Sequence, residues 1–150
     1  AGAVGLISLK IFGCYNKKTK YFGLYLAKAL QITNILRDIK QDKDMGRMYF
    51  PKEILNSVGI KTKKIILILK NKNFPKACVK LAKLADLNFK QADKQLKFCS
   101  KKELKSAILM MDTYKLLLKK LKKNGWESLE EKVSLTKLEK FFLFIKGLIY

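Results

Sequence analysis

Two arginines and two aspartates lie in one short stretch of this chain, and their types suit phosphate and metal chemistry. Of 33 basic residues, only Arg37 and Arg47 are arginine. Arginine carries a planar fork of N–H donors that can bind a phosphate or a carboxylate with two hydrogen bonds. Asp38 and Asp42 lie between the two arginines, one helical turn apart. Because Mg²⁺ takes one or two protein carboxylates and fills its other positions with water and phosphate oxygens, we expect the function to lie here.

The element that must position these side chains is a helix predicted over residues 20–44 and ended by Gly46. At about 100° per residue, its polar side chains fall in one stripe. The stripe consists of Gln31, Asn34, Asp38, Gln41 and Asp42, with Arg37 at its edge. Ile32, Ile35, Leu36 and Ile39 form the roughly opposite face. A polar helix face is also what any surface helix shows, so a merely solvated stripe is the alternative interpretation.

Two features favour a binding site over a solvated stripe. The like charges of Asp38 and Asp42 at i and i+4 cost roughly 0.2–0.5 kcal/mol unless a cation compensates them. Together with Asp44 they crowd the C-terminal half of the helix, where the helix dipole disfavours negative charge. Such an arrangement suits a hard cation and a phosphate.

The remaining pattern is helical, which predicts an all-α fold. We expect a buried helix over residues 1–13 closed by Gly13, and a short helix over residues 52–57. Residues 64–69 fit a strand or a helix equally well. From near Asn73, with Pro75 in the first turn, a longer helix is predicted. Its buried face comprises Leu81, Ala85, Phe89, Ala92 and Leu96.

Two further helices complete the predicted chain. Ser100 and Glu103 form a capping-box pattern, and Asn124-Gly125 ends the helix that follows. The inward residues of that helix are Leu104, Ala107, Ile108, Met111, Tyr114, Leu118 and Leu121. The last helix is predicted to start near residues 134–136. Its buried residues are expected to be Leu138, Phe141, Phe142, Ile145 and Ile149.

The composition excludes several classes of function. The chain contains no histidine, which rules out Ser–His and Cys–His catalysis and His-ligated zinc. Its three cysteines, Cys14, Cys78 and Cys99, form no C-x-x-C pair and indicate reduced, small apolar residues. No apolar run reaches the ~18–20 residues of a membrane span, and no signal peptide is seen. We therefore expect a cytoplasmic protein.

The net charge of +21 favours anionic partners. The lysines are spread through every segment and alternate with apolar residues, which favours a solvated coat on amphipathic helices. Few aromatic residues stand among the basic runs, so nucleic acid is not an expected partner. Peripheral contact with the inner face of a membrane is left open. Trp126 and the C-terminal Phe cluster are interpreted as packing residues.

The stretch around the aspartates closely resembles the second aspartate-rich motif of the squalene/phytoene synthase family. The matching segments are Ala29-Leu30-Gln31-Ile32-Thr33-Asn34-Ile35-Leu36-Arg37-Asp38, then Asp42, and Gly46-Arg47-Met48-Tyr49-Phe50-Pro51. Residues 1–13 resemble the family's glycine-containing helix upstream of this motif. Tyr114, Gly125-Trp126 and Lys132-Val133 resemble its closing segments. The resemblance is strongest to the bacterial presqualene-diphosphate and phytoene synthases. It covers essentially the whole chain but only the C-terminal half of the family's domain.

The resemblance implies an all-α, Mg²⁺-dependent prenyltransferase that joins two prenyl diphosphates head to head through a cyclopropyl intermediate. Asp38 and Asp42 would then be Mg²⁺ ligands, with Gln31 and Asn34 on the same polar wall. The diphosphate would be bound by Arg37, Arg47 and Lys132, while Tyr49 and Tyr114 would lie near the reacting ends of the substrates. Gly2, Ala3 and Gly5 would let a prenyl chain approach the helix backbone. NADPH would enter only if the product were reduced to squalene, which we do not expect.

Three departures from the family pattern matter. The first aspartate-rich motif, which belongs to the family's N-terminal half, has no counterpart in this chain. Gln41 stands where the family commonly has an acidic residue, and Lys132 where it often has a phosphate-binding arginine. Residues 1–150 are thus expected to form part of a domain, inactive alone or active with a separately supplied N-terminal half. The alternative is a non-catalytic remnant or a basic helical module that binds a membrane surface or nucleic acid.

Overall fold

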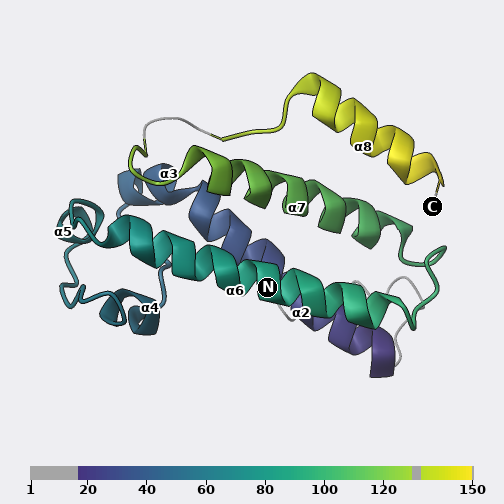
Figure 1. Cartoon of the computed structure of the whole chain (residues 1–150), viewed down its shortest axis with the longest axis horizontal. Coiled ribbons are helices and arrows are strands. Elements are labelled where there is room, and N and C mark those ends of the chain that lie inside the picture. Colours follow the sequence, from purple (N-terminus) through teal and green to yellow (C-terminus); the bar gives the residue numbers. More distant parts are fainter. Residues whose placement is uncertain (1–16, 130–132, 150) are drawn as a thin grey trace.

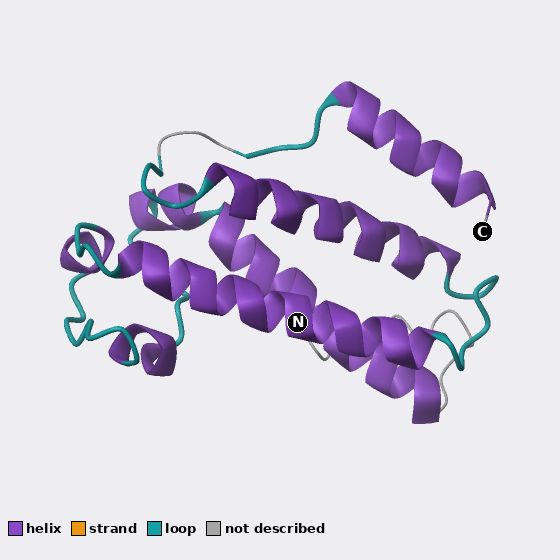
Figure 2. Ribbon diagram, viewed as in Figure 1, coloured by secondary structure: helices purple, strands orange, loops and turns teal. Residues whose placement is uncertain are grey.

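A computed structural model of the chain describes residues 17–129 and 133–149 (Figure 1). All regular secondary structure in this part is helical, which confirms the predicted all-α class (Figure 2). The helices are α2 (Lys17–Arg37), α3 (Ile39–Asp44), α4 (Lys52–Asn56), α5 (Ile65–Leu69), α6 (Phe74–Leu96), α7 (Lys105–Asn124) and α8 (Lys137–Ile149). The helix predicted over residues 1–13 lies outside the described residues.

The core forms chiefly where α2 packs against α6, and α7 lies alongside both (Figures 1 and 2). The predicted inner face of α6 is confirmed, because all five of its expected residues are buried. On α2, Phe22 and Leu36 are buried, and the small Ala29 is completely enclosed. Alanines at this contact allow the two helix backbones to approach closely. The result is one continuous apolar core that holds α2, and with it the aspartate stretch, in place.

Most of the inner face predicted for α7 is confirmed, but the predicted start of this helix is wrong. Leu104, Ile108, Met111, Leu118 and Leu121 are buried, while Ala107 and Tyr114 are partly buried. The helix begins at Lys105, without the capping box expected from Ser100 and Glu103, and residues 101–104 form turns. Leu104, the residue just before the helix, is buried in the core. The predicted stop is confirmed: the Gly125 N–H donates to the Leu121 carbonyl at 3.0 Å, with φ of 76° at Gly125.

The short elements confirm one prediction and settle one open alternative. The helix predicted over residues 52–57 is present as α4 and follows the extended Pro51. Residues 65–69, for which the sequence allowed a strand or a helix, form the one-turn helix α5. Both short helices lie at one end of the bundle (Figure 1), and α4 packs on α6.

Helix α8 starts where the sequence predicts but lies with the other face inward. A capping box forms between Thr136 and Glu139: the Glu139 N–H donates to the Thr136 hydroxyl, and the Thr136 N–H donates to the Glu139 carboxylate. The prediction that this helix buries its large apolar residues is wrong. Leu138, Phe141, Phe142 and Ile145 are all exposed, because α7 packs on the opposite side of α8. The expected burial of Ile149 concerns a side chain outside the described ones.

Candidate functional site

The aspartate stretch lies at a junction between two helices, where a single helix was predicted. Helix α2 ends at Arg37 and α3 begins at Ile39, so the expected helix over residues 20–44 is interrupted at Asp38. The backbone of Asp38 has φ −101° and ψ 15°, in the sparsely populated region where many active-site residues are found. The interruption sits at the first aspartate of the pair.

The interruption preserves the one-turn spacing of the polar side chains along the helix axis. The Asp38 N–H donates to the Asn34 carbonyl at 2.9 Å, and the Asp42 N–H donates to the Asp38 carbonyl at 2.8 Å. These i to i−4 hydrogen bonds keep Asn34, Asp38 and Asp42 one turn apart on the same side of the helices. All three are partly buried, whereas Gln31 and Gln41 are exposed at the ends and edge of the stripe.

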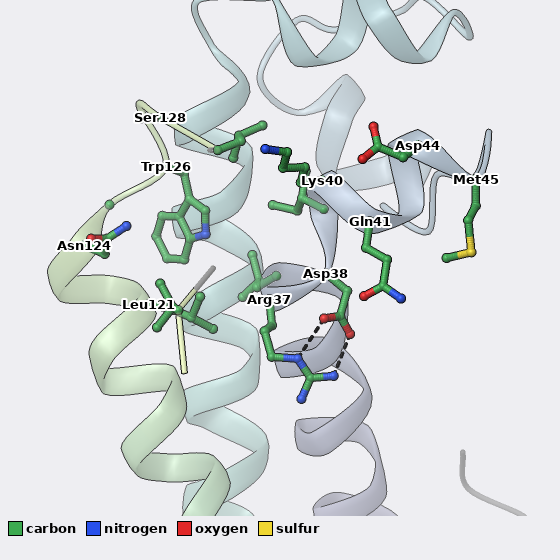
Figure 3. A pocket seen from close by; sticks show the side chains of 15 residues that line it. Arg37, Asp38, Lys40, Gln41, Asp44, Met45, Leu121, Asn124, Trp126 and Ser128 are labelled. Carbon is green, nitrogen blue, oxygen red and sulfur yellow. Dashed lines mark hydrogen bonds and ion pairs between the residues drawn. The ribbon is translucent and has the colours of Figure 1, made fainter. Parts of the chain in front are cut away.

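Arg37 and Asp38 form a bidentate ion pair. The Arg37 Nε donates to Asp38 Oδ1 at 2.8 Å, and a terminal guanidinium nitrogen donates to Oδ2 at 2.6 Å (Figure 3). The hydrogen bond that Arg37 donates to Asp38 is the largest influence on the pKa of Arg37 and raises it, while burial acts in the opposite direction. The fork of Arg37 is therefore engaged by a carboxylate of its own site. A phosphate reaching this site would compete with Asp38 for the same donors.

Tyr114, on another helix, lies close to the same guanidinium. It adds to the rise in the pKa of Arg37, with a smaller effect than that of Asp38. Helix α7, which carries Tyr114, packs directly on α2. The packing of α7 on α2 thus brings Tyr114 close to Arg37, although the two residues are far apart in the sequence.

Asp42 faces both a like charge and an opposite charge. Burial raises the pKa of Asp42, the neighbouring Asp38 raises it further, and Arg47 lowers it. The net shift is upward, which means that burial and the Asp38 charge together outweigh the effect of Arg47 on ionised Asp42. An additional cation would relieve this repulsion.

The position of Arg47 follows from the way α3 ends. Gly46 has φ of 68°, its N–H donates to the Lys43 carbonyl, and the Arg47 N–H donates to the Asp42 carbonyl at 2.7 Å. These two bonds form a Schellman motif, in which a left-handed residue reverses the chain after a helix. The predicted stop at Gly46 is confirmed, and the motif returns Arg47 to the side of Asp42.

The segment after Arg47 is fastened to the core by one aromatic residue. Phe50 is buried against Phe74 at the start of α6, with ring centroids 5.0 Å apart. Tyr49, its neighbour, is half exposed. The structure therefore anchors the loop of the motif at Phe50 and leaves Tyr49 at the surface.

A pocket of about 420 Å³ opens between the α2–α3 junction and the end of α7 (Figure 3). It contains the predicted site residues Arg37, Asp38 and Gln41, whereas Asn34, Asp42 and Tyr114 do not line it. Its remaining walls come from α2, α3, α7 and the segment after α7. They are Leu36, Ile39, Lys40, Asp44, Met45, Leu121, Asn124, Gly125, Trp126, Ser128, Leu129 and Val133.

Two of these wall residues could serve a site, and sequence reasoning did not select them. Lys40 lies one turn after Arg37 in the motif itself, so its spacing was the available signal. Trp126, expected to be a packing residue, is buried, and its indole Nε1 has no hydrogen-bond partner in the part of the chain that is described. The side-chain oxygen of Asn34 is likewise buried without a partner there. Buried polar atoms of this kind normally have a partner, so both are candidates for contact with a ligand.

Four predicted site residues lie outside the described residues. They are Gly2, Ala3, Gly5 and Lys132.

An isosteric substitution of Asp42 should stabilise the metal-free chain. We expect Asp42→Asn to raise the free energy of unfolding of the metal-free chain by about 0.2–0.5 kcal/mol, because it removes the cost of partly burying a charge and the repulsion from Asp38. The raised pKa means that the folded wild type holds the Asp42 proton more tightly than the unfolded chain does. The gain should therefore be full above the raised pKa and vanish as pH falls toward 3.8, the ordinary value. Urea unfolding at several pH values measures it, and destabilisation at neutral pH would contradict it.

Comparison with known proteins matches the chain to one family. Residues 1–139 match the family described as Squalene/phytoene synthase. A presqualene diphosphate synthase of Sinorhizobium fredii is 34% identical over 93% of this chain and 50% of its own length. One from Rhodopseudomonas palustris is 32% identical over 97% of this chain and 52% of its own length. A phytoene synthase of Mycobacterium tuberculosis is 41% identical over 41% of this chain and 20% of its own. The chain thus spans about half the length of the presqualene diphosphate synthases it matches.

Proposed function

The chain belongs to the squalene/phytoene synthase family, and from this premise we propose that it forms one wall of a two-sided active site that joins two prenyl diphosphates. The observation that carries the proposal is the register of Asn34, Asp38 and Asp42 beside Arg37. It presents oxygen ligands and a phosphate-binding fork on one side of α2 and α3. The opposite wall, with the other aspartate-rich motif, would come from a sequence that corresponds to the other half of the relatives.

The oxygen atoms at this wall fit a Mg²⁺ ion. Asp38 and Asp42 are neighbouring carboxylates, and burial together with Asp38 raises the pKa of Asp42; the buried Asn34 oxygen has no partner among the described residues. Within that part of the chain no group of three or more acidic, cysteine or histidine side chains is placed so as to hold a metal ion. A hard cation here would take one or two carboxylates from this wall and its other ligands from elsewhere. Bound there, the ion would supply charge stabilisation for a departing diphosphate.

The residues of the chain would divide the remaining work. Arg37 and Arg47 would bind diphosphate oxygens, and Lys132 would contribute a further positive charge. Tyr114 would hold the Arg37 guanidinium in position through the interaction that raises its pKa. Tyr49, half exposed on the loop, would lie near the reacting end of a substrate. When the bond between carbon and the diphosphate oxygen breaks, the diphosphate leaves with both electrons. The other substrate's double bond then attacks the carbon, and loss of a proton from the resulting cation would close the cyclopropyl ring.

The proposal is tested by restoring the opposite wall. The chain is co-expressed with the N-terminal half of the Sinorhizobium fredii relative, and product formation from farnesyl diphosphate and Mg²⁺ is followed by mass spectrometry. We expect product only when both parts are present, and none when the chain carries Asp38→Asn and Asp42→Asn together. Abundant product from the chain alone, or from the doubly substituted chain with its partner, would contradict the proposal.

Replacing Arg37 by lysine tests the two-handed contact. Arg37→Lys keeps the positive charge but loses the planar fork, so it should weaken Mg²⁺-dependent binding of inorganic diphosphate by about tenfold, the loss of roughly one charge-assisted hydrogen bond. Isothermal titration calorimetry with and without Mg²⁺ measures the effect. Lys115→Arg is a matched control, because Lys115 pairs with Asp93 on α6 and not with the aspartate stretch. An unchanged affinity in Arg37→Lys would remove Arg37 from the site.

A further inference from the structure

The outer face of α8 is apolar, which is the reverse of an ordinary surface helix. Five large apolar side chains of this helix are between 40% and 70% exposed. They are Leu138, Phe141, Phe142, Phe144 and Ile145. At about 100° per residue they cover one continuous arc of the helix surface. Figure 1 shows α8 as an outer helix, on the side of α7 away from α6.

The inner face of α8 is held by polar contacts and a glycine. Glu139 accepts a hydrogen bond from Lys120 at 2.7 Å, and Lys146 forms an ion pair with Asp112 at 2.6 Å. Gly147 lies against Leu109 so closely that a Cβ would come within 3.2 Å of it. These contacts of α8 with α7 oppose any rotation that would turn the phenylalanines inward. The exposed apolar arc is therefore part of the folded arrangement.

The charges around this arc are of one sign. Lys137 and Lys140 are exposed beside it, and the chain as a whole carries +21. Glu139 is the one acidic residue of the helix, and it is turned toward Lys120. An apolar face flanked by lysines with no outward acid complements a surface that is apolar within and anionic at its edge.

The length of α8 defines how it could meet such a surface. Thirteen residues extend about 20 Å, less than the ~30 Å of a bilayer's hydrocarbon core. No helix in the described part of the chain is long and apolar enough to cross a membrane. A contact with a bilayer would therefore be parallel to its plane.

We propose that α8 binds an anionic phospholipid bilayer in this in-plane orientation. Phe141, Phe142 and Phe144 enter the boundary between headgroups and acyl chains, and Lys137 and Lys140 contact the headgroup phosphates. A bilayer needs no shape matched to the protruding rings, and the single sign of the flanking charge matches an anionic lipid surface. This inference is independent of the function proposed for the aspartate stretch.

The test measures binding of the chain to vesicles by co-sedimentation. Vesicles of phosphatidylcholine with phosphatidylglycerol are compared with vesicles of phosphatidylcholine alone. We expect binding to the anionic vesicles that weakens with salt, and a loss of about tenfold or more in Phe141→Ser/Phe142→Ser, because two large apolar groups leave the interface. Leu84→Ser/Leu87→Ser is the matched control: both leucines are exposed on α6, so binding should change less than about twofold.

Far-UV circular dichroism first establishes that both double variants are folded. Equal losses in the two variants, or no loss in either, would overturn the proposal. Sedimentation velocity of the chain without lipid tests a second copy as the occupant: a dimer that disappears in Phe141→Ser/Phe142→Ser would overturn it. So would failure of the chain to bind vesicles while the same variant loses its complex with a supplied N-terminal half.

Discussion

Asp38→Asn should abolish the Mg²⁺-dependent part of diphosphate binding. The change keeps the shape of the side chain but removes one of the two carboxylates that face the proposed cation. The loss should be at least the ~10–100-fold that even an outer partner of a metal ligand costs. Calorimetric titration of inorganic diphosphate, with and without Mg²⁺, measures it. The Mg²⁺-dependent increment is the relevant quantity, because a chain of charge +21 also attracts diphosphate non-specifically.

The structure adds a second expectation for this variant. Asp38 accepts both hydrogen bonds of the Arg37 fork, so Asp38→Asn also releases Arg37. Metal-independent binding of diphosphate should then stay the same or increase slightly while the Mg²⁺-dependent part disappears. Asp93→Asn is the matched control: it breaks a partly exposed ion pair with Lys115, worth no more than about 1 kcal/mol, away from the site. Retention of the Mg²⁺ increment in Asp38→Asn would contradict the assigned role.

Phe74→Ala should lower the free energy of unfolding by about 3–5 kcal/mol. Phe74 begins α6, is 1% exposed, and packs on Phe50, so its removal leaves a cavity beneath the loop of the motif. Urea unfolding followed by circular dichroism measures the loss. Phe142→Ala makes the same chemical change at a side chain that is 67% exposed, and should cost less than about 0.5 kcal/mol.

The two phenylalanine variants also separate stability from function. Because Phe50 fastens the segment that carries Arg47 and Tyr49, Phe74→Ala should weaken Mg²⁺-dependent diphosphate binding even where the chain is still folded. Phe142→Ala should leave that binding unchanged. Similar unfolding free energies for both variants would show that the Phe50–Phe74 contact does not anchor the loop.

The candidate site could be predicted from the sequence to the extent that it is local. Asn34, Asp38 and Asp42 are spaced by single helical turns, and Arg47 follows a glycine stop, so their proximity depends on backbone hydrogen bonds within one segment. The Arg37–Asp38 pair and the neighbouring Tyr114 could not be predicted in this way. They depend on side-chain rotamers and on the packing of α7 against α2, which no periodicity encodes.

By itself, the sequence determined the helical class, the inner faces of α6 and α7, and the stops at Gly46 and Gly125. Each of these follows from local propensity and from the match between apolar spacing and the helical repeat. The tertiary structure alone decided the pocket that joins Lys40 to Trp126 and the outward turn of the α8 phenylalanines. An amphipathic pattern predicts which face of a helix is apolar, but the packing of neighbouring elements decides whether that face is covered. On α8 the ion pairs and Gly147 hold the polar side inward, and the apolar side is left for a partner.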